Sequence, residues 1–235
     1  RGIGTYALGQ ATTGIGIRSQ RYSTDMAINN LVYQASLPTQ VHARGEYWAT
    51  VAWEATWAII QQAGTINPDI YFNGTSTAGN AVAMRIAIQA MKLAPCSSGF
   101  IDHRDGWLRA DTLLYGGTYS CAIWRAFAKR GMGFFASQGS PNSASDQVPD
   151  FTPKSYVTIA ASAPTVPDGQ NLTYTNTVTT CSGAAIAGYS LQSTLPLNVT
   201  FVSATNGGVY NGATRVITWP VNQAATSSVT YQFTV

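Results

Sequence analysis

Hydrophobic residues recur at helical spacing in the first part of the chain. Four segments show this pattern, and each ends at a Gly or before a Pro: residues 40–63, 78–94, 98–115 and 120–131. The first is the longest and carries two offset apolar stripes, which indicates a largely buried helix. The apolar residues of its main stripe are Val41, Trp48, Ala52, Ala55 and Ile59. The pattern therefore predicts a mainly α-helical lobe.

The pattern changes near residue 150 to short runs rich in β-branched residues. Partial alternation of apolar and polar positions in these runs predicts strands, and the Asn-Gly-Gly at 206–208 signals a turn between two of them. Short strands at such spacing are typical of an immunoglobulin-like β-sandwich. The expected strands are 155–161, 171–180, 199–205, 215–221 and 227–235.

Charge and turn residues divide the chain at the same place. Only Lys154, Asp168 and Arg215 are charged after Asp150. The stretch "GSPNSASDQVPDFTP" is rich in Pro, Ser and Asp, which favours a linker. We therefore expect three parts: a helical lobe over residues 1–140, a linker over 141–153, and an all-β immunoglobulin-like sandwich over 154–235.

Composition limits the function and the location of the protein. Charged residues make up 10% of the 235 residues, against about 25% in average proteins. Low charge with abundant Thr, Gly and Tyr is typical of extracellular bacterial proteins, so we expect a secreted or cell-surface protein. The net charge of +3 is too small to indicate nucleic-acid binding. No apolar run reaches the roughly 18 residues of a membrane span.

The chain starts at Arg1 without an initiator Met, which indicates a processed product or a piece of a longer protein. Three cysteines allow three single bridges, and none has CxxC spacing. Of these pairings we carry forward Cys96–Cys121, which leaves Cys181 free. That bridge would join the end of the second helix to the start of the fourth. It would close a loop of about 25 residues, which is worth roughly 3 kcal/mol in the chain-entropy model.

The stretch "HARGE" places His42 and Glu46 one helical turn apart. A stable zinc site needs three or four protein ligands, and this stretch lacks the second histidine of HExxH. The other histidine, His103, lies in a polar stretch. The residues therefore predict no metal site within this chain. His42 could be a catalytic residue with partners elsewhere or a structural histidine in the core.

Three stretches resemble the C-terminal part of the fungalysin family of zinc metallopeptidases: "GIGIRSQRYSTDMAINNLVY", "VHARGEYWATVAWEATWAII" and residues 93–133. Together they cover most of residues 1–140. The resemblance implies a thermolysin-like fold, protein or peptide substrates, and zinc as cofactor. It also implies that the zinc ligands, the two histidines of HExxH and a later glutamate, lie in an N-terminal part of the same precursor. We expect this chain alone to be inactive.

The resemblance also assigns two site residues. Val41-His42 matches a Val-His pair that begins a long helix, where the histidine binds the oxyanion of the tetrahedral intermediate. Arg18, in "IRS", matches an arginine that binds a substrate carbonyl. An imidazole N–H and a guanidinium suit both tasks. The stretch before His42 lacks the carboxylate that orients this histidine in thermolysin, so Glu46 or Asp25 could take that role, although Glu46 fits a structural role better.

The tail from about residue 154 resembles an immunoglobulin-like repeat of bacterial surface proteins, through "TYTNTVT", "NVTFVSATNGG" and "ITWPV". In that family the repeat spaces or attaches other domains. The sequence therefore predicts the C-terminal portion of a secreted zinc metalloendopeptidase with an appended sandwich. The alternative is a non-catalytic structural or adhesive surface protein that uses a peptidase-derived fold.

Overall fold

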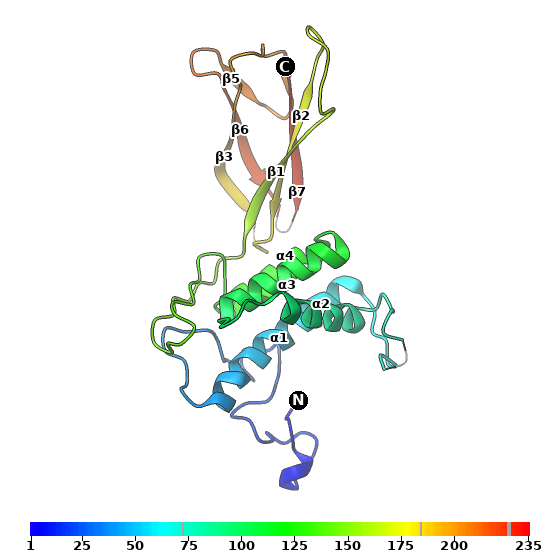
Figure 1. The fold of residues 1–235 in the computed structure, drawn as a ribbon, viewed down its shortest axis with the longest axis vertical. Coiled ribbons are helices and arrows are strands. Elements are labelled where there is room, and N and C mark those ends of the chain that lie inside the picture. Colours follow the sequence, from blue (N-terminus) through cyan, green and yellow to red (C-terminus); the bar gives the residue numbers. More distant parts are fainter. Residues whose placement is uncertain (72, 184, 225–226) are drawn as a thin grey trace. The chain divides into compact units, whose positions relative to one another are not determined.

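The chain folds into two compact units, Arg1–Pro153 and Lys154–Val235. The computed structural model describes residues 1–71, 73–183, 185–224 and 227–235. The first unit contains the helices and the second the β-sheets (Figure 1). The predicted fold class, a helical lobe followed by an all-β part, is thereby confirmed.

The helices of the first unit begin and end close to the predicted residues. Gln40 caps the longest by accepting a hydrogen bond from the Ala43 N–H at 2.7 Å, and Gly64 ends it in the left-handed conformation. No described helix is long and apolar enough to cross a membrane. The four helices are α1 (Val41–Ala63), α2 (Gly79–Leu93), α3 (Phe100–Tyr115) and α4 (Ser120–Lys129), preceded by a short 3-10 turn η1 (Tyr6–Leu8).

One hydrophobic core holds the four helices together. α1 packs against α2 and α4, and α3 packs against α2 and α4. Ile59, Ile86 and Phe127 are fully buried in this core. α1 and α2 approach so closely that a Cβ at Gly79 would lie 2.4 Å from the Ile60 Cα, so glycine is required there.

The segment predicted to be a linker is part of the first unit. Met132 and Ser137 form β-bridges to Asp150 and Val148, and the Leu37 N–H donates to the Ala144 carbonyl at 2.7 Å. The residues predicted to be a linker, 141–153, are therefore packed within the first unit. Composition favours an open chain here, but backbone pairing with the preceding strand-like residues fixes the segment.

The second unit consists of two antiparallel sheets with strand orders β1-β2-β7-β4 and β3-β6-β5. Trp219 of β6 is fully buried and contacts Tyr231 and Phe233 of β7, with ring centroids about 6 Å apart. The two sheets therefore share one core. The strands are β1 (Ser155–Ala161), β2 (Thr173–Thr180), β3 (Ile186–Thr194), β4 (Ser203–Ala204), β5 (Val209–Asn211), β6 (Val216–Gln223) and β7 (Ser228–Thr234).

Candidate functional site

His42 lies in the first turn of α1, two residues after the Gln40 cap, and its side chain is exposed. Within the described part of the chain its imidazole has no hydrogen-bond partner. It is therefore not a core histidine satisfied by backbone groups. Its ring nitrogens are available to a group that approaches the start of the helix.

Glu46, one turn further along α1, holds the loop that carries Arg18. Its carboxylate accepts hydrogen bonds from the Ser19 N–H at 3.1 Å, the Ser19 hydroxyl at 2.9 Å and the Gln20 N–H at 3.0 Å. The residue is only 5% exposed, so these bonds compensate for the desolvation of a buried charge. Glu46 thus attaches the two residues after Arg18 to the helix of His42.

Neither carboxylate considered as a partner for His42 forms a hydrogen bond or ion pair with it. The oxygens of Glu46 are occupied by the loop, and Asp25 accepts the N–H of Ala27 at 2.9 Å. The expectation that one of them orients the imidazole is therefore not met among the described residues. The structural role expected for Glu46 fits its contacts.

Arg18 lies half-buried on the same loop, beside Tyr22. Burial raises the pKa of Tyr22, and the positive charge of Arg18 opposes this rise. The Nε of Arg18 is buried and has no hydrogen-bond partner among the described residues. A buried unpaired guanidinium N–H is unfavourable, so Arg18 has an unused donor that a ligand carbonyl or carboxylate would satisfy.

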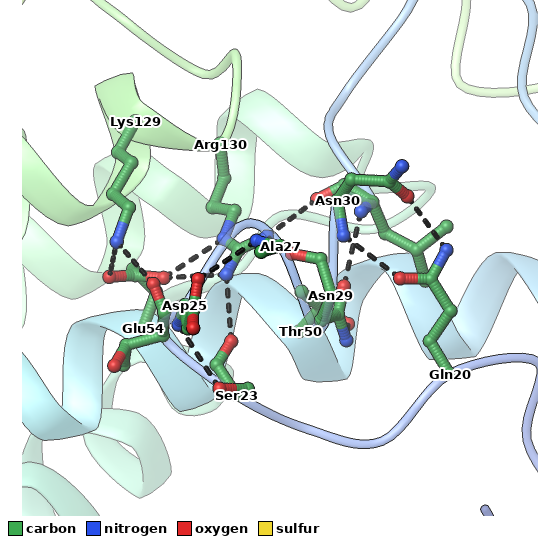
Figure 2. Close-up of polar contacts among 12 residues, drawn as sticks. Gln20, Ser23, Asp25, Ala27, Asn29, Asn30, Thr50, Glu54, Lys129 and Arg130 are labelled. Carbon is green, nitrogen blue, oxygen red and sulfur yellow. Dashed lines mark hydrogen bonds and ion pairs between the residues drawn. The ribbon is translucent and has the colours of Figure 1, made fainter.

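A buried ion pair fixes the segment that follows the Arg18 loop (Figure 2). Arg130, at the end of α4, is 0% exposed and donates to Glu54 of α1 at 2.9 and 2.7 Å. Its remaining N–H groups donate to the carbonyls of Ser23, Asn29 and Leu31. The guanidinium of Arg130 thus connects the segment after the Arg18 loop to α1 and α4.

Sequence reasoning did not identify this second glutamate as a fixing group, although a signal was present. Glu46 and Glu54 lie eight residues apart in a helix that is otherwise mostly apolar. That spacing places both on one helix face, and buried carboxylates require partners. Both glutamates are indeed buried, and both bind the N-terminal segment or the residues that hold it.

The predicted Cys96–Cys121 bridge is wrong. Cys96 is exposed and carries a free thiol, whereas Cys121 belongs to a disulfide bond. The prediction followed the order of the helices along the chain, but a disulfide depends on Cα atoms about 4.4–6.8 Å apart. α3 packs against both α2 and α4, and Cys96 faces solvent in the turn after α2.

The described residues do not fit a metal ion. They contain no group of three or more His, Cys, Asp or Glu side chains that could hold one. His42 and Glu46 do not converge on a common point, because Glu46 is bonded to the loop at 19–20. The candidate site residues that the sequence predicts, His42 and Arg18, are both hydrogen-bond donors.

The known proteins that resemble this chain match its helical unit. The chain is 42% identical over 131 residues to an extracellular metalloproteinase MEP of Neosartorya fischeri, which covers 54% of this chain and 20% of that protein. It is 39% identical over 139 residues to extracellular metalloproteinase 10 of Coccidioides posadasii, covering 57% of the chain and 22% of the relative. The chain thus spans about a fifth of the length of these fungal relatives. The bacterial source expected from the tail stays a prediction.

The sequence model described as Fungalysin metallopeptidase (M36) matches residues 1–136. These residues include the Arg18 loop, His42, both buried glutamates and all four helices. The match covers more than half of the chain, which therefore belongs to the fungalysin (M36) metallopeptidase family.

Proposed function

We propose that the helical unit supplies the substrate-binding and oxyanion-stabilising residues of a secreted zinc metalloendopeptidase. The supporting observation is the attachment of the Arg18 loop to the helix of His42 through the buried carboxylate of Glu46. This contact keeps two hydrogen-bond donors on neighbouring parts of one framework. Relatives named extracellular metalloproteinases support both the reaction class and secretion.

The chemistry of the two donors suits peptide hydrolysis. Attack on a peptide carbonyl places negative charge on its oxygen, and a fixed N–H donor stabilises that charge more in the transition state than in the substrate. We assign this role to His42, whose imidazole is exposed at the helix start. Arg18 would bind a further carbonyl of the peptide and fix its position.

Zinc would be held by residues outside these 235 residues. The described residues do not form a metal site, and the chain spans about a fifth of its relatives. We therefore propose that an N-terminal part of the same precursor completes the catalytic site. In this proposal the isolated chain does not cleave peptides, and an assay of these 235 residues on casein, with and without EDTA, tests that point.

The substitution His42→Ala in the full-length enzyme tests the catalytic role. Removal of one oxyanion donor typically lowers kcat by about 10²–10³-fold, and we expect a loss of this size with unchanged zinc content. Gln61→Ala is the matched control, because Gln61 is exposed on the same helix. Steady-state kinetics and atomic absorption give the two readings.

Three results would contradict this assignment. Loss of zinc in His42→Ala would show that the histidine is a ligand. Unchanged kcat, with normal zinc, would show that His42 makes no contact in the transition state. Equal effects of His42→Ala and Gln61→Ala would point to helix stability in place of chemistry.

The alternative is a structural or adhesive surface protein, and the second unit is the observation that favours it. Lys154–Val235 forms its own core beyond the residues matched by the family. We propose an immunoglobulin-like sandwich with a spacing or attachment role for this unit in either case. Hydrolysis of casein by the full-length protein that EDTA abolishes would exclude the purely structural alternative.

A further inference from the structure

Two adjoining cavities lie between the starts of α1 and α3 and the loop at 138–147. The larger has a volume of about 270 Å³ and the smaller about 80 Å³. Arg44, Ser98, Gly99 and Phe100 line both of them. The two cavities therefore adjoin, and we treat them as one site; neither His42 nor Arg18 lines it.

The larger cavity has an aromatic and aliphatic wall. Val41, Trp48 and Phe100 line it, and the Trp48 ring lies 6.0 Å from Phe100 and 5.1 Å from His103, between centroids. Burial lowers the pKa of His103, so its imidazole is uncharged at neutral pH. Gly45 leaves the entrance open, because a Cβ there would meet no atom within 4 Å. The cavity suits an apolar side chain.

Of the described residues that line the two cavities, Arg44 alone is charged at neutral pH. Its Nε donates to the Pro38 carbonyl at 3.1 Å. This bond fixes the guanidinium and leaves its terminal N–H groups available to a ligand. Among the described residues, no carboxylate lines the site. The nearby acidic residues, Asp102 in the first turn of α3 and Asp146 of the loop at 138–147, already accept backbone N–H groups. An anionic group is therefore the complementary partner.

Gln147 supplies a buried acceptor in the smaller cavity. It is 6% exposed, and its Nε2 donates to the Ser143 carbonyl at 3.0 Å and the Asp146 carboxylate at 3.2 Å. Its Oε1 is buried and has no partner among the described residues. Such an acceptor costs free energy unless a donor reaches it, and a ligand N–H would be that donor.

We propose that this site binds the C-terminal end of a peptide. The terminal carboxylate pairs with Arg44, the last side chain, which is apolar, occupies the Trp48 cavity, and a backbone N–H donates to Gln147 Oε1. An apolar wall, one unopposed cation and one unpaired acceptor match these three features of a peptide terminus. The proposal does not depend on the catalytic role of His42.

The test compares acetyl-Ala-Ala-Phe with its C-terminal amide by isothermal titration calorimetry on the 235-residue chain. A charged hydrogen-bonded contact is worth at least about a tenfold change in affinity. We expect the acid to bind at least about tenfold more tightly than the amide. Arg44→Gln should remove this difference, because its side chain no longer carries a charge.

Two further variants complete the test. Gly45→Leu fills the open entrance and replaces a helical glycine by a better helix former, so it should abolish binding in a protein that remains folded. Arg109→Gln, at an exposed position of α3, should bind as the wild type does. Equal affinities for acid and amide, unchanged binding by Gly45→Leu, or no binding at all would overturn the proposal.

Discussion

His42 and Glu46 lie one helical turn apart on α1 but differ in their contacts at the candidate site. His42 is exposed and has no hydrogen-bond partner in the described part of the chain, whereas Glu46 is buried and bound to the loop of Arg18. The i, i+4 spacing that suggested a shared ligand places them on one face, but the loop at 19–20 lies against Glu46 and takes its oxygens. We therefore propose that Glu46 is a positioning residue and that His42 contacts the substrate.

Glu46→Gln should displace the Arg18 loop. The amide keeps one acceptor oxygen and loses the charge, so Ser19 and Gln20 lose part of their bonding, at a cost of about 1–3 kcal/mol in the free energy of unfolding. In the full-length enzyme we expect KM to rise more than kcat falls, because substrate binding is the role that we propose for Arg18. Asp69→Asn is the control, since Asp69 is exposed. A fall in kcat alone would contradict the positioning role.

His103 gives the protein a pH-dependent stability. Burial lowers its pKa in the folded chain below the unfolded value of about 6.5. Between the two pKa values the unfolded chain therefore binds more protons than the folded chain. The stability that the uncharged His103 contributes is fully present above pH 6.5 and is lost as the pH falls through the folded pKa. Urea unfolding followed by tryptophan fluorescence at pH 7.5 and 5.5 measures it. His103→Asn should reduce the difference between the free energies of unfolding at the two pH values. An unchanged difference would show that His103 is not its source.

At the scale of elements, the Arg130–Glu54 pair joins α1, α4 and the N-terminal segment. Glu54→Gln would leave the fully buried Arg130 without its counter-ion, which typically costs about 3–5 kcal/mol. Lys129→Gln is a matched control because Lys129 binds the same carboxylate with a side chain 40% exposed, and surface pairs contribute about 0–1 kcal/mol. Denaturant unfolding of both variants measures the contrast. Equal losses would show that burial does not decide the strength of the pair.

Helix positions could be predicted from the sequence more completely than strand positions. Each helix has an apolar stripe and an end signal, such as Gly64 after α1. The strand β3 (Ile186–Thr194) was missed, because its central residues are mostly polar and Gly188 adopts a positive φ of 76°. β5 was missed because its three residues follow a turn. β3 is specified by pairing with β6, which lies far along the chain, whereas β5 forms a local hairpin with β6.

For the whole molecule, the long-range contacts around the two candidate donors could not be predicted from the sequence. His42 and Arg18 lie in local motifs, and their roles stay predictions. The bond from Glu46 to Ser19 spans 27 residues and that from Arg130 to Ser23 spans 107, and no local pattern encodes such pairs. The disulfide prediction failed for the same reason, since it required distances in space that chain order does not give.

The division into two units makes a prediction about independent unfolding. Trp219 is fully buried in the core of the second unit and donates its indole N–H to the Thr205 carbonyl at 2.8 Å. Replacing a buried Trp by Ala costs about 3–5 kcal/mol, and domains have only about 0.05–0.15 kcal/mol of stability per residue. Trp219→Ala should therefore unfold most of Lys154–Val235 and leave the helical core intact.

Circular dichroism and limited proteolysis distinguish the outcomes of this substitution. The helical signal at 222 nm should persist, and protease should leave a resistant fragment that ends near Pro153, where the first unit ends. Tyr189→Ala, at a position 67% exposed on β3, should leave both units resistant. Loss of the helical signal in Trp219→Ala would mean that the helical unit depends on the sheets for its stability, since Trp219 itself contributes only to the core of the second unit.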